Sequence, residues 1–113
     1  MKTIIAGGRD IFDPSILEEA IVESGFRITS VVCGGATGVD TLGEEWANNK
    51  SLKVEYYYPD WKNHGKAAGM IRNRKMAENA EALIAIWNGS SKGTKNMIET
   101  ALKLNLLVYV KRV

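Results

Sequence analysis

Short apolar segments alternate with amphipathic segments along the whole chain, and no linker, repeat or low-complexity tract interrupts this alternation. The apolar segments have the length and composition of buried strands. These predicted strands are residues 3–6, 28–33, 53–58, 82–87 and 106–110. Strands that alternate with helices are typical of a parallel sheet covered by helices on both faces.

The intervening segments predict four helices, because their apolar residues recur at spacings of three and four. The expected helices are residues 14–24, 39–49, 67–79 and 94–104. The first begins at Asp13-Pro14, a cap followed by a proline, and ends before Gly25. We expect one α/β domain over residues 1–113, with right-handed crossovers and the strand order 3-2-1-4-5.

Three glycine-rich stretches follow the first, second and fourth predicted strands, namely "GGRD" (7–10), "CGGATGVD" (33–40) and "NGSSKGT" (88–94). The predicted strand order brings all three to the crevice beyond the carboxyl ends of the strands, where ligands bind in such sheets. The ligand-binding residues expected there are Gly7, Gly8, Arg9, Gly34, Gly35, Ala36, Thr37, Gly38, Asn88, Gly89, Ser90, Ser91, Gly93 and Thr94.

A phosphate is the ligand group that such loops favour, because free N–H groups at a helix start and bare glycine backbone hold anions. For the glycines we favour close approach of a ligand over a tight turn. Thr37 and Asp40 also fit a capping box, and for Asp40 we favour capping over ligand contact. Thr94 likewise fits a helix cap. The loops match neither the NTPase phosphate loop nor the GxGxxG fingerprint, which disfavours ATP hydrolysis and hydride transfer to NAD.

Composition narrows the function classes further. Cys33 is the single cysteine and ends an apolar run, so we expect an inert core thiol in a reducing cytoplasm. No second cysteine or histidine lies at metal-ligand spacing from it or from His64, so we expect no metal and no required cofactor.

The net charge of +2 is too small to indicate a nucleic-acid binder by itself. No apolar run is long enough for a membrane helix, so no membrane partner is expected.

A further motif run, "PDWKNHGKAAGMIRNRKM", covers residues 59–76. Together with the three glycine-rich stretches, it resembles the SLOG superfamily, which joins the Smf/DprA and LOG proteins, and most closely its small stand-alone YspA-like branch. The matching residues of the run are Pro59, Asp60, Trp61, Gly65, Ala68, Gly69, Arg72, Asn73 and Met76. The resemblance covers almost the whole chain. It implies a Rossmann-like three-layer sandwich that binds nucleotides or nucleotide-derived ligands, with Arg72 and Asn73 as ligand-binding signature residues.

The resemblance leaves enzymatic activity open. LOG proteins cleave the N-glycosidic bond of nucleoside 5′-monophosphates with an arginine and glutamates. Their arginine corresponds to Arg74, and their paired glutamates correspond to Asn96 and Met97, which cannot stabilise an oxocarbenium-like transition state as a carboxylate does. Carboxylates from other loops could replace them. The catalytic candidates are Arg74, Asp40 and Asp10, with Glu44 a further carboxylate.

Three hypotheses follow. The first is binding of a nucleotide or nucleotide-derived small molecule in a sensor, sponge or accessory role. The second is an N-glycosidic hydrolase acting on nucleoside monophosphates or ADP-ribose-type substrates. The third is single-stranded nucleic-acid binding, because aromatic residues that either stack on bases or pack the sheet gather near the third strand, namely Tyr56, Tyr57, Tyr58 and Trp61. We also expect a homodimer or higher oligomer.

Two further side chains, Arg9 and Trp87, have two readings each. Arg9 either contacts an anionic ligand or pairs with Asp10 or Asp13. Trp87 either stacks on a base at the crevice or is buried under a helix. Arg72 and Arg74 are two positions apart on a helix, so only one of them is expected to face the pocket or a partner.

Overall fold

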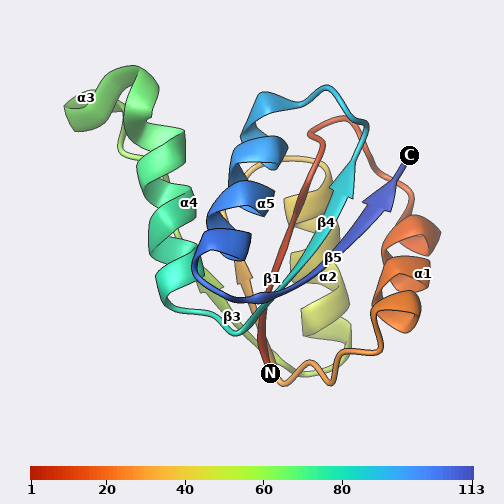
Figure 1. The fold of residues 1–113 in the computed structure, drawn as a ribbon. Helices are drawn as coiled ribbons and strands as arrows, with labels where there is room; N and C mark the ends of the chain where they lie inside the picture. Colours follow the sequence, from red (N-terminus) through yellow and green to blue (C-terminus); the bar gives the residue numbers. More distant parts are fainter.

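The computed structural model describes residues 1–113 and contains one five-stranded, all-parallel sheet with the order β3-β2-β1-β4-β5 (Figure 1). The strands are β1 (Lys2–Gly7), β2 (Ser30–Cys33), β3 (Lys53–Tyr56), β4 (Ala82–Trp87) and β5 (Leu107–Arg112). The predicted strand order and the all-parallel arrangement are confirmed. The fold is an α/β sandwich of the Rossmann-like kind.

Helices pack on both faces of this sheet. They are α1 (Pro14–Ser24), α2 (Val39–Asn49), α4 (Ala68–Glu78) and α5 (Lys92–Lys103), with a short α3 (Trp61–His64) and a 3-10 turn η1 (Gly65–Ala67) before α4. The helices α1 and α2 cover one face, and α4 and α5 cover the other. None of the helices combines the length and the apolar character that crossing a membrane requires.

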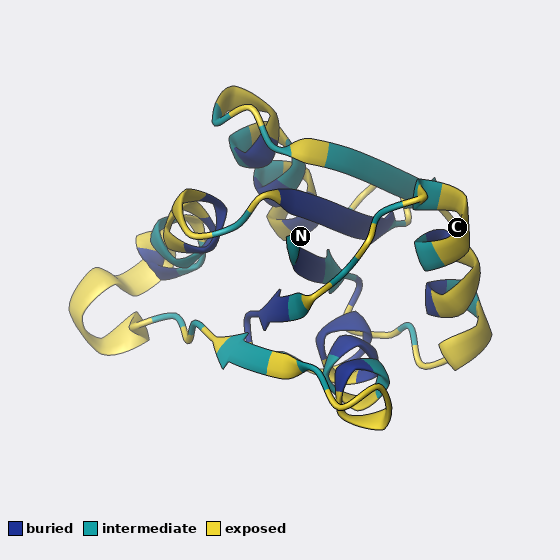
Figure 2. Ribbon diagram, turned by 90° about the horizontal axis from the view of Figure 1, so that it is seen from below, coloured by how far each residue is buried: buried dark blue, intermediate teal, exposed yellow.

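The core consists of two apolar layers that share the central strands. Ile4 and Val32 face α4 and α5, whereas their neighbours Ile5 and Val31 face α1 and α2, and all four side chains are fully buried. Figure 2 shows the central strands in dark blue between helices whose outer sides are yellow. Burial from both sides explains why these strands read as continuous apolar runs in the sequence.

Several strand boundaries differ from the sequence prediction. The strand β1 runs from Lys2 to Gly7 rather than over residues 3–6, and β2 begins at Ser30 rather than at residue 28. The third strand ends at Tyr56 rather than at residue 58. Its partner β2 ends at Cys33, which pairs with Tyr56, and the chain beyond Cys33 turns into the glycine-rich loop. Residues 57–58 therefore have no partner strand. The strand β5 instead runs on to Arg112 because β4 offers it a partner as far as Trp87.

Helix starts also differ from the prediction. Residues 61–64, expected as a loop, form α3, because the Asp60 carboxylate accepts hydrogen bonds from the backbone and side-chain amides of Asn63. The helix expected over 67–79 is α4, over residues 68–78. The last helix begins at Lys92, since Ser91 rather than Thr94 is its N-cap.

Candidate ligand-binding site

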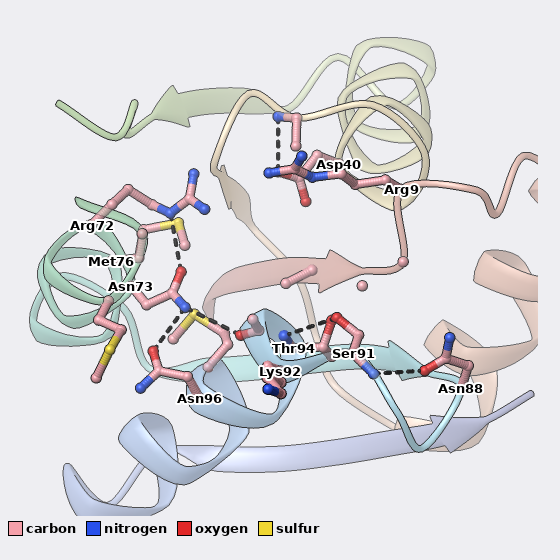
Figure 3. Close-up of a pocket in the computed structure, with 18 of the residues that line it drawn as sticks. Arg9, Asp40, Arg72, Asn73, Met76, Asn88, Ser91, Lys92, Thr94 and Asn96 are labelled. Atoms are coloured by element: carbon pink, nitrogen blue, oxygen red, sulfur yellow. Dashed lines mark hydrogen bonds between the residues drawn. The ribbon is translucent and has the colours of Figure 1, made fainter. Parts of the chain in front are cut away.

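A cavity of about 580 Å³, called the main cavity below, lies at the carboxyl edge of the sheet (Figure 3). Its walls come from the β1–α1 loop, the start of α2, the inner side of α4 and the β4–α5 loop. The convergence of these segments agrees with the crevice that the strand order predicts. The predicted residues that line it are Gly7, Gly8, Arg9, Asp10, Ala36, Asp40, Arg72, Asn73, Asn88, Ser91, Gly93 and Thr94.

A second cavity of about 390 Å³, called the side chamber, adjoins the main cavity. It lies between the glycine-rich loop after β2 and the segment that follows β3. Its lining comprises Arg9, Gly34, Gly35, Ala36, Thr37, Tyr58, Pro59, Trp61 and Arg72. The residues common to both cavities are Arg9, Ala36, Trp61 and Arg72, which therefore form a junction. The predicted residues Gly38, Gly89 and Ser90 line neither cavity.

The half-buried guanidinium of Arg72 is held rigidly at this junction. Its Nη1 donates to the carbonyl oxygen of Gly34 at 2.8 Å and to that of Tyr57 at 3.4 Å, and its Nε donates to Asn73 Oδ1 at 3.0 Å. Burial lowers the pKa of Arg72, and the Asp40 carboxylate opposes that shift. The Nη2 group makes no hydrogen bond within the protein. Two donors of a fixed cation are thus left for a ligand.

Asp40 organises the glycine-rich loop from within. Its Oδ2 accepts hydrogen bonds from the backbone N–H groups of Gly34 at 3.2 Å and Ala36 at 3.1 Å. Burial raises the pKa of Asp40, whereas these bonds and the charges of Arg72 and Arg9 lower it. The predicted capping box is wrong. The N-cap of α2 is Gly38, with no side-chain cap, and the Thr37 hydroxyl instead donates to the Arg9 carbonyl at 3.4 Å.

The glycines of the loop after β2 make room for other parts of the protein. A Cβ at Gly34 would overlap the Arg72 guanidinium, and one at Gly35 would overlap the Tyr58 ring. Gly38 has φ 74°, and a Cβ there would overlap the backbone of the β1–α1 loop. We expected these glycines to admit a ligand, but intramolecular packing accounts for them. Gly93 differs, because a Cβ added at this position would have no other part of the protein within 4 Å.

The β4–α5 loop is shaped by its own polar side chains. Asn88 Oδ1 accepts from the N–H groups of Ser90 at 2.8 Å and Ser91 at 2.9 Å. The Ser91 hydroxyl oxygen then accepts from Thr94 N at 3.4 Å and caps α5. The backbone N–H groups of Lys92 and Gly93 make no hydrogen bond within the protein, and both residues line the main cavity. The positive end of the α5 dipole is therefore directed at the cavity.

Trp87 supports this loop from outside the cavities. Its Nε1 donates to the Ser91 carbonyl at 3.1 Å, and the Arg112 guanidinium lies 5.2 Å from the centre of its ring. Trp87 lines neither cavity. It is half-buried and positions the loop, so of its two readings, stacking on a base at the crevice is the one that the structure does not favour.

Basic side chains outnumber acidic ones around the main cavity. The lining contains Arg9, Lys66, Arg72 and Lys92 against Asp10 and Asp40. Arg9 forms no ion pair, with Asp10, Asp13 or any other carboxylate. The lining therefore carries more positive than negative side chains, and the Asp40 carboxylate is already bound by two loop amides.

Arg74, the position that corresponds to the LOG arginine, faces away from the cavities. Its side chain is 61% exposed and pairs with Glu78 at 3.5 Å. The spacing argument that Arg72 and Arg74 face different ways is confirmed. Glu44, the further carboxylate considered from the sequence, also lies outside both linings.

The two positions at which LOG proteins carry glutamates are occupied differently. Asn96 Oδ1 accepts a hydrogen bond of 2.9 Å from Asn73 Nδ2, and Met97 is 1% exposed in the core under the cavity. Asn73 also donates to the Gly93 carbonyl at 3.3 Å. It is 5% exposed, so its observed role is to join α4 to the start of α5 (Figure 3).

Sequence reasoning missed several lining residues. Lys66, Met70 and Met76 reach the main cavity from the η1–α4 segment, and Lys92 reaches it from the start of α5. Their spacing was a usable signal, because Lys66, Met70 and Asn73 follow one another at intervals of four and three and share a helix face. Lys92 was not predicted, because the glycine and hydroxyl residues of its loop were interpreted as the groups that bind the ligand.

The fold and the cavity define a Rossmann-like α/β domain with a cavity at the carboxyl edge of its sheet that is lined mainly by basic charged side chains. Residues 1–64 match the family model described as the YspA, cpYpsA-related SLOG family (YAcAr), and the chain belongs to this family. The resemblance seen in the motifs is thereby confirmed. The chain is similar to the gene 61 protein of Mycobacterium phage D29, with 30% identity over 116 residues that cover 95% of this chain and 93% of that protein. No solved structure matches the chain significantly.

Proposed function

We propose that this protein binds a nucleotide or nucleotide-derived small molecule whose phosphate lies in the main cavity. The observation that carries the proposal is the start of α5, where the free N–H groups of Lys92 and Gly93 and the Lys92 side chain border one cavity. A volume of about 580 Å³ is within the range of small-molecule sites. Membership of the SLOG family is consistent with nucleotide-related binding.

Residues from the first turns of α2 and α5 both line the main cavity, and α5 suits a phosphate better than α2 does. The amides before α2 already bind the Asp40 carboxylate, and the backbone of the β1–α1 loop packs against Gly38. At α5 the N–H groups are free, Gly93 leaves open space, and the only charge nearby on the loop is the Lys92 ammonium. A dipole end, free donors and a cation together favour a phosphate.

The structure supports binding without cleavage as the role. Glycosidic cleavage needs a carboxylate beside the scissile bond. Asn96 and Met97 supply none, and the Asp40 oxygen that faces the loop is engaged by two amides. Asp10, exposed on the β1–α1 loop, is the remaining carboxylate in the lining. We therefore propose a sensor, sponge or accessory role over a hydrolase.

Isothermal titration calorimetry with AMP, ADP, ADP-ribose and inorganic pyrophosphate tests the proposal. Lys92→Ala removes the cation at the start of α5, and Lys95→Ala is its matched control, because Lys95 lies on the same helix but outside the lining. We expect saturable binding to the wild type, a loss of about tenfold in affinity for Lys92→Ala, and no change for Lys95→Ala. No binding of any probe, or an equal loss in both variants, contradicts the proposal.

The two alternative functions are tested on the same samples. Chromatography of AMP and ADP-ribose after incubation detects free base or ribose phosphate, and any turnover shows that the ligand is a substrate. A labelled single-stranded oligonucleotide, in gel shifts at low and high salt, detects phosphate-dependent nucleic-acid binding. We expect neither product release nor a gel shift.

A further inference from the structure

We propose that the side chamber is a subsite for an aromatic base, with Tyr58 and Trp61 as its stacking surfaces. The ligand then extends past Arg9 and Arg72 into the main cavity with its phosphate. This inference rests on the proposed function and narrows it, because it requires a ligand that keeps its base. Sugar phosphates and free polyphosphates are thereby excluded as the full ligand.

The side chamber has the composition of a base-binding pocket. Tyr58, Pro59 and Trp61 form one wall, and the backbone of the loop after β2 forms the other. Tyr58 is 67% exposed and Trp61 is 53% exposed. Aromatic rings of this size on a chamber wall offer π-faces on which any base can stack.

The Tyr58 ring is held in place before any ligand arrives, and the Trp61 ring lies beside α4. The Tyr58 ring stacks on Tyr56, with ring centres 5.9 Å apart and planes within 6°. One edge of the Tyr58 ring also fills the space over Gly35. Trp61 begins α3, whose N-cap is Asp60, and its ring lies near Gly69, where a Cβ would contact Cη2 at 3.7 Å. Because the Tyr58 ring is packed in this way, it loses little conformational entropy when a base binds.

The junction supplies the link between base and phosphate. Arg9 and Arg72 line both cavities, the Arg9 side chain has no partner, and Arg72 retains the two donors of Nη2. Tyr58 and Pro59 line only the side chamber, Trp61 lines both cavities beside these cations, and the start of α5 lines only the main cavity. A nucleotide has the same order of parts, with an aromatic base at one end and an anionic group at the other.

Matched pairs of probes separate the base from the phosphate, namely AMP with ribose 5-phosphate and ADP with inorganic pyrophosphate. The variants are Tyr58→Leu and Trp61→Leu. Phe12→Leu is the control, because Phe12 is 66% exposed and lines neither cavity. We expect each test variant to weaken AMP and ADP by about fivefold or more and to leave ribose 5-phosphate and pyrophosphate unchanged. Tyr58→Phe, which keeps the ring, should retain the affinity of the wild type.

The outcomes distinguish this inference from the proposed function. If AMP binds the wild type no better than ribose 5-phosphate, or if Tyr58→Leu and Trp61→Leu weaken both members of a pair equally, the base subsite is overturned while anion binding stands. If no probe binds the wild type, the proposed function itself fails. Circular dichroism and the thermal midpoint of each variant establish that it is folded, and Tyr58→Phe gives a readout that does not depend on removing the ring.

Discussion

Arg72 Nη1 donates a 2.8 Å hydrogen bond to the carbonyl oxygen of Gly34, a residue far away in the sequence. This bond joins α4 to the glycine-rich loop after β2 and places a partly buried cation where the main cavity meets the side chamber. Gly34 must lack a Cβ for the guanidinium to lie there. The glycine and the arginine of two separate motifs therefore act as one structural unit.

Replacing Arg72 should weaken both the fold and anion binding. Arg72→Ala leaves the Gly34 carbonyl without its donor and removes one of the two positive charges near the buried Asp40 carboxylate, so we expect a loss of about 1–3 kcal/mol in the free energy of unfolding. Urea unfolding measures it. Arg74→Ala, which breaks only an exposed pair with Glu78, is the stability control and should change little. Equal stability of Arg72→Ala and the wild type would show that the junction is not structural.

Substitutions should distinguish a glycine that leaves space for a ligand from a glycine that the packing of the protein requires. Gly93→Ala places a methyl group in open space at the start of α5, so we expect the free energy of unfolding to stay the same or rise by up to about 1 kcal/mol. The same methyl group narrows the approach to the free N–H groups, so the affinity for ADP should fall. Thermal unfolding and calorimetry on one preparation measure both effects. Unchanged ADP affinity would place the phosphate elsewhere.

Gly38→Ala should behave in the opposite way. Gly38 has φ 74°, and a Cβ would overlap the backbone of Gly8 and Arg9. We expect a loss of about 2 kcal/mol or more in the free energy of unfolding. Chemical denaturation measures this loss. A Gly38→Ala protein as stable as the wild type would mean that this loop can repack.

The ionisation of Asp40 should make the free energy of unfolding depend on pH. Its folded-state pKa is raised above the ordinary 3.8, mainly by burial, so the folded protein binds a proton more tightly than the unfolded chain does. The stabilisation of the folded protein by this proton is therefore fully present below pH 3.8, and it is lost as the pH rises through the folded-state pKa of Asp40. Asp40→Asn keeps an oxygen that accepts from the loop amides but cannot titrate.

The comparison of Asp40→Asn with the wild type isolates the effect of Asp40 ionisation on the free energy of unfolding. We expect the stability of the variant, relative to the wild type, to increase as the pH rises through the folded-state pKa and to level off above it. Asp40→Ala should instead cost about 1–3 kcal/mol, because two loop N–H groups lose their acceptor. Urea denaturation at a series of pH values measures both. A pH-independent difference for Asp40→Asn would refute the assignment.

Cys33 should be unreactive in the folded protein. Its thiol is buried, and burial, together with the charges of Asp40 and Glu44, raises its pKa to about 12. At neutral pH it is therefore protonated and inaccessible, and the thiolate is the reactive form. A colourimetric thiol reagent should react slowly with the native protein and rapidly in denaturant. Fast modification without denaturant would contradict the burial of this side chain.

Much of the fold could be predicted because its signals are local. The bounds of α1, residues 14–24, were predicted because Asp13, Pro14 and Gly25 are cap residues that act on their immediate neighbours. The strand order followed from the alternation of strands and helices. The start of α5 was missed because Ser91 and Thr94 are both hydroxyl residues at the head of an amphipathic segment, and only the structure shows which one is the cap.

The location of the site could be predicted from the sequence, but the roles of several of its residues could not. The three loops could be assigned to one crevice because parallel strands direct their carboxyl ends to one edge. Arg72 was assigned to the ligand site from the resemblance to the SLOG superfamily. The role of the glycines could not be deduced, because the groups that fill their missing side-chain space, such as Arg72 at Gly34 and Tyr58 at Gly35, come from distant parts of the chain. For the same reason Asp40 was interpreted as a cap.

Backbone amide chemical shifts during an ADP titration test the central claim most directly. The account predicts saturable shifts of the Lys92 and Gly93 N–H signals, because these donors are free and line the main cavity. The N–H signals of Gly34 and Ala36 should move little, since Asp40 already binds them. Shifts confined to the loop after β2, or no saturable shift at the start of α5, would contradict the account.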